Sequence, residues 1–137
     1  MENLVGHTIR EVDLSDNGFN LIIKTETHRF TYRTEGDCCA HAYILEPRPN
    51  DVADIIGHEV MSVIRNGFSK EDPEGWGTTD TEFISIQTHN GDLDLELRTE
   101  HNGYYSGWIN FVSKESIWPI HDYIREEALT LLEATEQ

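Results

Sequence analysis

The strongest constraint on the fold is a strict alternation of apolar and polar side chains on both sides of Asn90-Gly91. The alternating apolar positions are Ile84, Ile86, Thr88, Leu93, Leu95 and Leu97. Successive side chains of a β-strand point to opposite faces, so a period of two predicts strands with one buried face. An Asn-Gly pair supplies the positive φ angles of a two-residue hairpin turn, which makes the two strands antiparallel neighbours.

A second feature is a pattern that occurs twice along the chain. Residues 5–12 match residues 56–63, and an Asn-Gly-Phe follows each of them, at 17–19 and 66–68. Arg-Thr-Glu then occurs at 33–35 and 98–100, and residues 36–44 align loosely with 102–109. Four matches in the same order predict two similar half-units of about four strands each, over residues 4–46 and 55–112.

The same patterns predict the individual elements. Strands are expected at residues 7–14, 19–27, 28–34, 40–46, 58–65, 82–89, 92–99 and 106–112. A short helix is expected at 51–56 after Pro47 and Pro49, and residues 69–81 are expected to form an acidic insertion loop. The predicted fold class is therefore α+β, mainly antiparallel β-sheet from two similar four-stranded half-units.

The C-terminal residues change to a helical period. Apolar residues recur at three- and four-residue spacing, at Ile117, Ile120, Ile124, Ala128 and Leu131. With Ser116 as the N-cap, this spacing predicts an amphipathic helix over about 117–135. The helix is expected to complete a single domain over residues 1–137, and Trp118, Leu131 and Leu132 leave enough apolar surface for a possible homodimer contact.

The charge of the chain limits its partners. The 137 residues contain 10 Lys and Arg against 26 Asp and Glu, a formal net charge of −16. Residues 4–46 carry four basic and seven acidic residues, whereas residues 47–137 carry six and eighteen. An excess of this size repels phosphate backbones and anionic lipid, so neither direct nucleic-acid binding nor membrane docking is expected. The expected partner is a basic protein surface.

The main candidate site is an acidic ladder in the strand 92–99. Asp92, Asp94 and Glu96 stand on one face at intervals of about 6.8 Å, twice the antiparallel rise. This ladder can meet a basic partner, together with the acidic loop residues Glu71, Asp72 and Glu74. The alternative is an ordinary solvated outer face of a half-buried hairpin.

A second candidate is the aromatic and glycine-rich segment 102–108. Tyr104, Tyr105 and Trp108, with Arg33 or Arg98, could hold a small ligand by stacking and charge. The alternative is ordinary core packing of the aromatic rings.

Catalysis, metal binding and cofactor binding are not expected. His7 and His58 occupy equivalent places after a glycine in the two half-units, which indicates a shared structural role at the start of a strand. No zinc-binding spacing, nucleophile elbow or phosphate loop is present. Cys38 and Cys39 are adjacent and would close only a strained disulfide, so two reduced thiols on opposite strand faces are expected.

Four motifs together resemble a known group of proteins. They are Gly6-x-x-Ile9-x-x-Val12, Gly36-Asp37-Cys38-Cys39 followed by Tyr43-Ile44, Ile56-Gly57 leading into Val60 and Val63, and Asn102-Gly103-Tyr104-Tyr105-Ser106. The combination is similar to a family of short phage and prophage proteins of unknown function, over about residues 4–112. The resemblance implies no chemistry of its own, but a phage setting favours an inhibitor of host proteins.

The leading functional expectation is therefore a non-catalytic, phage-encoded counter-defence inhibitor that occludes a basic surface, such as a nucleic-acid-binding one, of a host defence protein. Two alternatives stay open: a sequestering protein for a small nucleotide immune signal, and a small enzyme acting on such a nucleotide. Without an apolar run of about 20 residues or the regions of a signal peptide, the protein is expected in the cytoplasm, which for a phage protein is that of the host cell.

Overall fold

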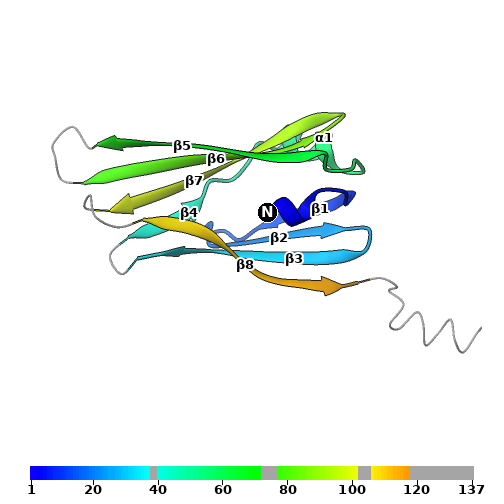
Figure 1. Ribbon diagram of the computed structural model, residues 1–137, viewed down its shortest axis with the longest axis horizontal. Coiled ribbons are helices and arrows are strands. Elements are labelled where there is room, and N and C mark those ends of the chain that lie inside the picture. The colour runs from blue at the N-terminus through cyan, green and yellow to red at the C-terminus, as the bar shows by residue number, and fades with distance from the viewer. Residues whose placement is uncertain (38–39, 72–76, 102–105, 118–137) are drawn as a thin grey trace, which may run out of the picture.

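The computed structural model describes residues 1–37, 40–71, 77–101 and 106–117. A short 3-10 helix, η1 (Glu2–Leu4), and one α-helix, α1 (Pro49–Ile55), accompany eight strands (Figure 1). The strands are β1 (Ile9–Leu14), β2 (Asn20–Thr25), β3 (His28–Gly36), β4 (His41–Ile44), β5 (Ser62–Glu71), β6 (Thr78–Thr88), β7 (Gly91–His101) and β8 (Gly107–Ser116). Neither helix of this described part is long and apolar enough to cross a membrane.

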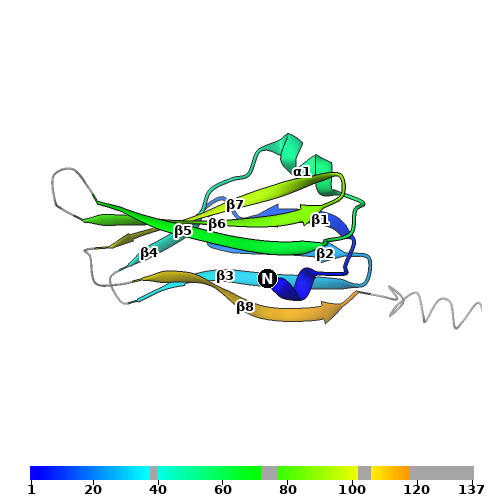
Figure 2. The ribbon, with the colours of Figure 1, turned by 45° about the horizontal axis from the view of Figure 1, so that its top comes forward.

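The strands form two antiparallel sheets that face each other, as the views of Figures 1 and 2 agree. Sheet 1 has the order β1-β2-β3-β8, and sheet 2 has the order β4-β7-β6-β5. The alternating apolar residues of both sheets point into the space between them. The core consists of Met1, Leu4, Ile9, Leu21, Ile23, Phe30, Tyr32, Ala42, Ile44, Ile55, Val60, Ile84, Ile86, Leu93, Leu95 and Leu97.

The two sheets exchange their fourth strands. The first half of the chain supplies β1 to β4, yet β4 pairs with β7 of the second half. Conversely, the second half supplies β5 to β8, and β8 pairs with β3 of the first half. Each sheet therefore consists of three strands from one half and one strand from the other, so the half-units and the sheets do not coincide.

The duplicated motif lies where the two halves meet directly. The amides of Gly6 and Val60 donate to the carbonyl oxygens of Val60 and His7 (both 2.9 Å). In return, the amides of Gly57 and Ile9 donate to Ile9 (2.7 Å) and His58 (3.0 Å). Adding 51 to each residue number of the first motif gives its counterpart, and under this rule the four bonds exchange in pairs. The motif therefore pairs with its own copy about a local two-fold axis.

The two halves also have similar hydrogen bonds on both sides of this ribbon. The amides of His7 and His58 donate to the carbonyls of Leu4 (3.0 Å) and Ile55 (3.1 Å), which confirms the shared structural role of the two histidines at backbone level. At the β2–β3 turn the Thr25 hydroxyl donates to the His28 carbonyl (3.2 Å). At the β6–β7 turn the Thr88 hydroxyl donates in the same way to Gly91 (2.7 Å).

Two expectations need correction. The loop expected at 69–81 is largely strand, because β5 and β6 continue to pair through Ser69 with Asp80 and Glu71 with Thr78. Asn66-Gly67 lies inside β5 and is not the equivalent of the turn at Asn17-Gly18, where Gly18 has a φ of 77°. Ser116 is the last residue of β8 and stands opposite His28. The helix expected at 117–135, with its dimer residues, lies otherwise outside the described residues.

Candidate functional site

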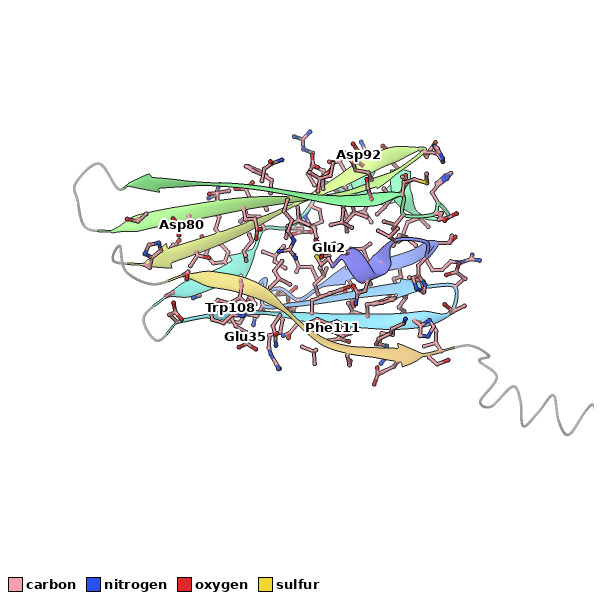
Figure 3. The ribbon with its side chains drawn as sticks, in the orientation of Figure 1. Glu2, Glu35, Asp80, Asp92, Trp108 and Phe111 are labelled. Atoms are coloured by element: carbon pink, nitrogen blue, oxygen red, sulfur yellow. The ribbon has the colours of Figure 1, made fainter. Side chains whose placement is uncertain are left out.

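The acidic ladder lies on the outer face of sheet 2. Leu93, Leu95 and Leu97 of β7 are buried, so the residues between them face away from the other sheet. Asp92 and Asp94 are exposed, and Glu96 is half-buried. Figure 3 places Asp92 near the β6–β7 turn, at the opposite end of the sheet from Asp80. The alternation alone was sufficient to predict this outward position.

Only part of the ladder is neutralised. The Arg98 Nε lies 2.8 Å from Glu96 Oε2, and this hydrogen bond and charge raise the pKa of Arg98. The Tyr43 hydroxyl of β4 donates to Glu100 Oε2 (2.8 Å), and this bond raises the pKa of Tyr43. Within the described residues, no ion pair joins Asp92 or Asp94 to a cation. Two carboxylates of the ladder are therefore exposed to solvent and have no ion-pair partner among the described residues.

Apolar side chains lie on the same outer face. Phe83 of β6 stands opposite Glu96 and is 38% exposed. Ile64 of β5 stands opposite Ser85 and is 44% exposed. The face thus combines unneutralised carboxylates with apolar surface, a composition suited to a protein partner.

The outer face of sheet 1 is different because three of its cations each have an acidic neighbour. Lys24 Nζ lies 3.5 Å from Glu11 Oε1, and Arg29 Nη1 lies 3.6 Å from Glu115 Oε1. The third pair joins Arg33 Nε to Glu35 Oε2 at 3.8 Å. Among the described residues, the uncompensated acidity is therefore greater on sheet 2.

The second candidate set does not gather at one place. Trp108 of β8 stands opposite Glu35 and is 42% exposed, and Arg33 stands opposite Asn110 on the same sheet. Figure 3 shows Trp108 and Glu35 near each other. Arg98 lies on sheet 2, so the two arginines are on different sheets. Tyr104 and Tyr105 lie outside the described residues.

Of the remaining predicted residues, one is described. Glu71 is the last residue of β5. Asp72 and Glu74 lie outside the described residues, as do Cys38 and Cys39. The residues bordering the cysteines are described: Asp37 accepts hydrogen bonds from the backbone amide (2.9 Å) and the hydroxyl (3.3 Å) of Ser106. The two motifs that begin at Gly36 and Asn102 are therefore joined in space.

Sequence reasoning missed a polar group between the sheets. Arg65 Nε lies 3.4 Å from Glu2 Oε2, and Arg65 Nη1 lies 3.5 Å from Glu82 Oε2. Nearby on β6, Asp80 Oδ2 lies 2.8 Å from His101 Nε2. The alternation along the strand could have predicted this group, because Asp80 and Glu82 share the parity of the buried Ile84 and therefore point inward.

A histidine cluster lies at the opposite end of sheet 1. The rings of His7 and His28 have centroids 5.5 Å apart, and His7 Nδ1 lies 3.8 Å from Glu26 Oε1. Burial lowers the pKa of His28, and the charges of Lys114 and His7 lower it further. In the part of the chain that the structure describes, no three His, Cys, Asp or Glu side chains are grouped to hold a metal ion.

The fold and this surface define a class: a two-sheet antiparallel β protein with exchanged strands and one acidic outer face. The chain belongs to a family described as a domain of unknown function, DUF7448, whose model matches residues 2–111. No curated protein and no solved structure matches the chain.

Proposed function

We propose that this protein is a non-catalytic binding protein whose acidic outer face of sheet 2 binds a basic surface of another protein. The single observation that carries the proposal is the difference between the two outer faces. Asp92 and Asp94 have no ion-pair partner in the described part of the chain, whereas Lys24, Arg29 and Arg33 on sheet 1 are each paired.

Unpaired surface charges affect the rate of association with a partner more than they affect the affinity. Unpaired surface carboxylates create a negative potential that attracts a positive partner over about one Debye length, roughly 8–10 Å at physiological salt. Such steering raises association rates and suppresses wrong partners. The exposed Phe83 and Ile64 beside the ladder supply apolar area that can be removed from water after the encounter.

A narrower target is part of the proposal. The resemblance to short phage and prophage proteins favours a host defence protein, and the acidity favours a basic, nucleic-acid-binding surface on it. The protein would then act by occupying that surface in place of nucleic acid, in the cytoplasm of the host cell. Glu71, Asp72 and Glu74 are included in the proposed contact set because the same partner would meet acidic residues there too.

Nucleotide sequestration is the second candidate, and it has weaker support. The exposed Trp108 on the same sheet as Arg33 is the observation in its favour. However, Glu35 lies 3.8 Å from Arg33 and also accepts a hydrogen bond from Asn110 (3.2 Å). A phosphate would have to displace this carboxylate. An enzyme acting on such a nucleotide would face the same obstacle.

The test uses two variants with the same change in net charge. Asp92→Asn with Asp94→Asn neutralises the ladder, and Glu11→Gln with Glu115→Gln neutralises two acids of sheet 1. Each immobilised protein is exposed to bacterial lysate at about 50 mM and about 300 mM NaCl, since salt screens exposed charges. We expect a basic protein to be retained by the wild type and the sheet 1 variant at low salt, and to be lost with the ladder variant.

Equal capture by all three proteins would contradict the proposal. A nucleotide released from the wild type on denaturation, in place of a captured protein, would instead support sequestration. A nucleotide that is consumed and returned as a product would indicate an enzyme.

A further inference from the structure

A hollow of about 590 Å³ lies between β1, the β1–β2 turn and the chain that leaves β4 toward α1. Val12, Leu14 and Val52 form part of its wall and pack against the hydrophobic core. Tyr43, on the β4 side, is also among the residues that line it. The hollow therefore has an apolar part to its wall, in a surface that is otherwise strongly charged.

Three carboxylates border this depression: Asp13, Asp16 and Glu46. All three residues are exposed, and none takes part in an ion pair within the described residues. No Lys or Arg is among the residues that line it. An apolar wall with an unneutralised acidic rim is complementary to a side chain with an apolar stem and a cationic head.

The second half of the chain shows that the fold does not require a hollow with acidic residues and no cation. A hollow of about 460 Å³ lies at the corresponding place, between β5 and β8. There the acids have partners, since Arg65 pairs with Glu82 and His101 with Asp80. Under the 51-residue correspondence, Leu14 of the first hollow takes the place of Arg65 of the second. The first half thus lacks the internal cation that its copy has.

The hollow also lies next to the acidic face. The chain segment 45–47 borders it on one side and borders a smaller hollow of about 240 Å³ on the other. Asp94 and Glu96 of the ladder line this smaller hollow, next to Phe83. A partner lying on the ladder could therefore reach over segment 45–47 into the larger hollow.

We propose that the hollow bordered by Asp13, Asp16 and Glu46 is the docking site for an arginine side chain of the basic partner protein. This inference rests on the proposed function, and it names the residue type that the partner presents. The guanidinium can bond two carboxylates at once, and its methylene stem packs on the apolar part of the wall. Arginine is preferred to lysine because its planar head matches carboxylates in a bidentate manner.

The experiment titrates the full chain with N-acetyl-arginine amide and follows backbone amide shifts by NMR. N-acetyl-citrulline amide, which has almost the same shape without the charge, is the matched control ligand. We expect saturable shifts at residues 13–18 and 43–49 with the arginine compound and none with the citrulline compound. Asp13→Asn with Asp16→Asn should weaken binding at least about fivefold, as loss of charge-assisted hydrogen bonds requires.

The control variant is Glu11→Gln with Glu115→Gln, which changes the net charge equally but leaves the hollow intact. It should bind N-acetyl-arginine amide within about twofold of the wild type, because its altered charges are outside the hollow. Dispersed amide spectra of all variants confirm folding, and Glu46→Gln provides a second rim variant.

Shifts confined to β7 would overturn the inference while leaving the acidic-face proposal standing. Shifts that are the same for the citrulline compound, or the absence of saturable shifts at the hollow, would also overturn it. Failure of the proposed function itself is recognised separately, by equal protein capture with the wild type and the ladder variant.

Discussion

At the scale of single residues, the parity of a carboxylate along its strand determines whether it needs a partner. Asp80 and Glu82 share the inward parity of Ile84 and meet His101 and Arg65 between the sheets. Asp92 and Asp94 have the outward parity on β7. They stand opposite Gln87 and Ser85 and form no ion pair with a described residue. Charges that point inward must be paired because burial removes water from them. Outward charges are free of this requirement and remain available to a partner.

Gly18 provides a sharp test of backbone geometry at this scale. Its φ is 77°, and a Cβ atom there would collide with the carbonyl oxygen of Ile44, whose own amide donates to the Gly18 carbonyl (2.8 Å). Gly18→Ala should lower the free energy of unfolding by about 3 kcal/mol or more. Gly57→Ala is the control, because Gly57 has a φ of 87° with open space around it and should cost only about 1–2 kcal/mol. Urea unfolding measures both, and equal losses would contradict this account of the turn.

His28 gives a prediction of pH dependence. Burial, Lys114 and His7 lower its pKa in the folded state, against the opposing charge of Glu26. The folded state then binds fewer protons than the unfolded chain, so stability is fully present above the ordinary histidine pKa of about 6.5 and falls as the pH drops below it. We expect His28→Gln to lose less stability than the wild type between pH about 7 and pH about 5.5. Thermal unfolding across this range measures the difference, and parallel curves would argue against the prediction.

At the scale of elements, the sequence was sufficient to predict all eight strands but not all of their neighbours. The alternation around Ile84 and Leu93 determines which side chains are buried, and Asn90-Gly91 determines one hairpin. Nothing in the alternation of residues 40–46 indicates that β4 pairs with β7 and not with β3. This choice is made by the short connection after Gly36, where Asp37 is bound by Ser106 and the chain crosses to the other sheet. Such a contact between distant residues leaves no periodic signal.

The ribbon formed by the duplicated motif should behave as one structural unit. The amides of Gly6, Ile9, Gly57 and Val60 each donate to the opposite copy. Since the four bonds are reciprocal, opening one copy breaks the bonds of the other. Hydrogen exchange followed by NMR should show all four amides protected to a similar degree, and far more than the exposed turn amide of Asn17. Fast exchange of one copy with slow exchange of the other would contradict the reciprocal pairing.

At the scale of the whole molecule, strand exchange makes the two halves depend on each other. A fragment 1–47 carries β1 to β4 but lacks β8, and a fragment 48–137 lacks β4. We expect neither fragment alone to unfold cooperatively as a monomer, because each would leave one sheet edge and one strand's apolar face without a partner. When co-expressed, they should form a one-to-one complex, measured by size-exclusion chromatography and circular dichroism. A cooperative monomeric fold of 48–137 alone would refute this dependence.

The candidate site was predictable to the same extent as the fold. The outward position of Asp92, Asp94 and Glu96 followed from alternation, and the pairing of Glu96 with Arg98 follows from their two-residue spacing on one face. The hollow beside β1 was not predictable, because it depends on how segment 45–49 leaves sheet 2 and passes the β1–β2 turn. The pairing of charges on the outer face of sheet 1 was not predictable either, because Arg29 meets Glu115 only through the exchanged strand β8.

The measurement that tests the central claim most directly is the association rate constant with the purified captured partner as a function of salt. For the wild type we predict a rate that falls steeply between about 50 mM and about 300 mM NaCl, as electrostatic steering requires. Asp92→Asn with Asp94→Asn should be at least about tenfold slower at low salt with a flatter dependence, whereas Glu11→Gln with Glu115→Gln should follow the wild type. Identical rates and slopes for the two double variants would contradict the claim that the outer face of sheet 2 binds the partner.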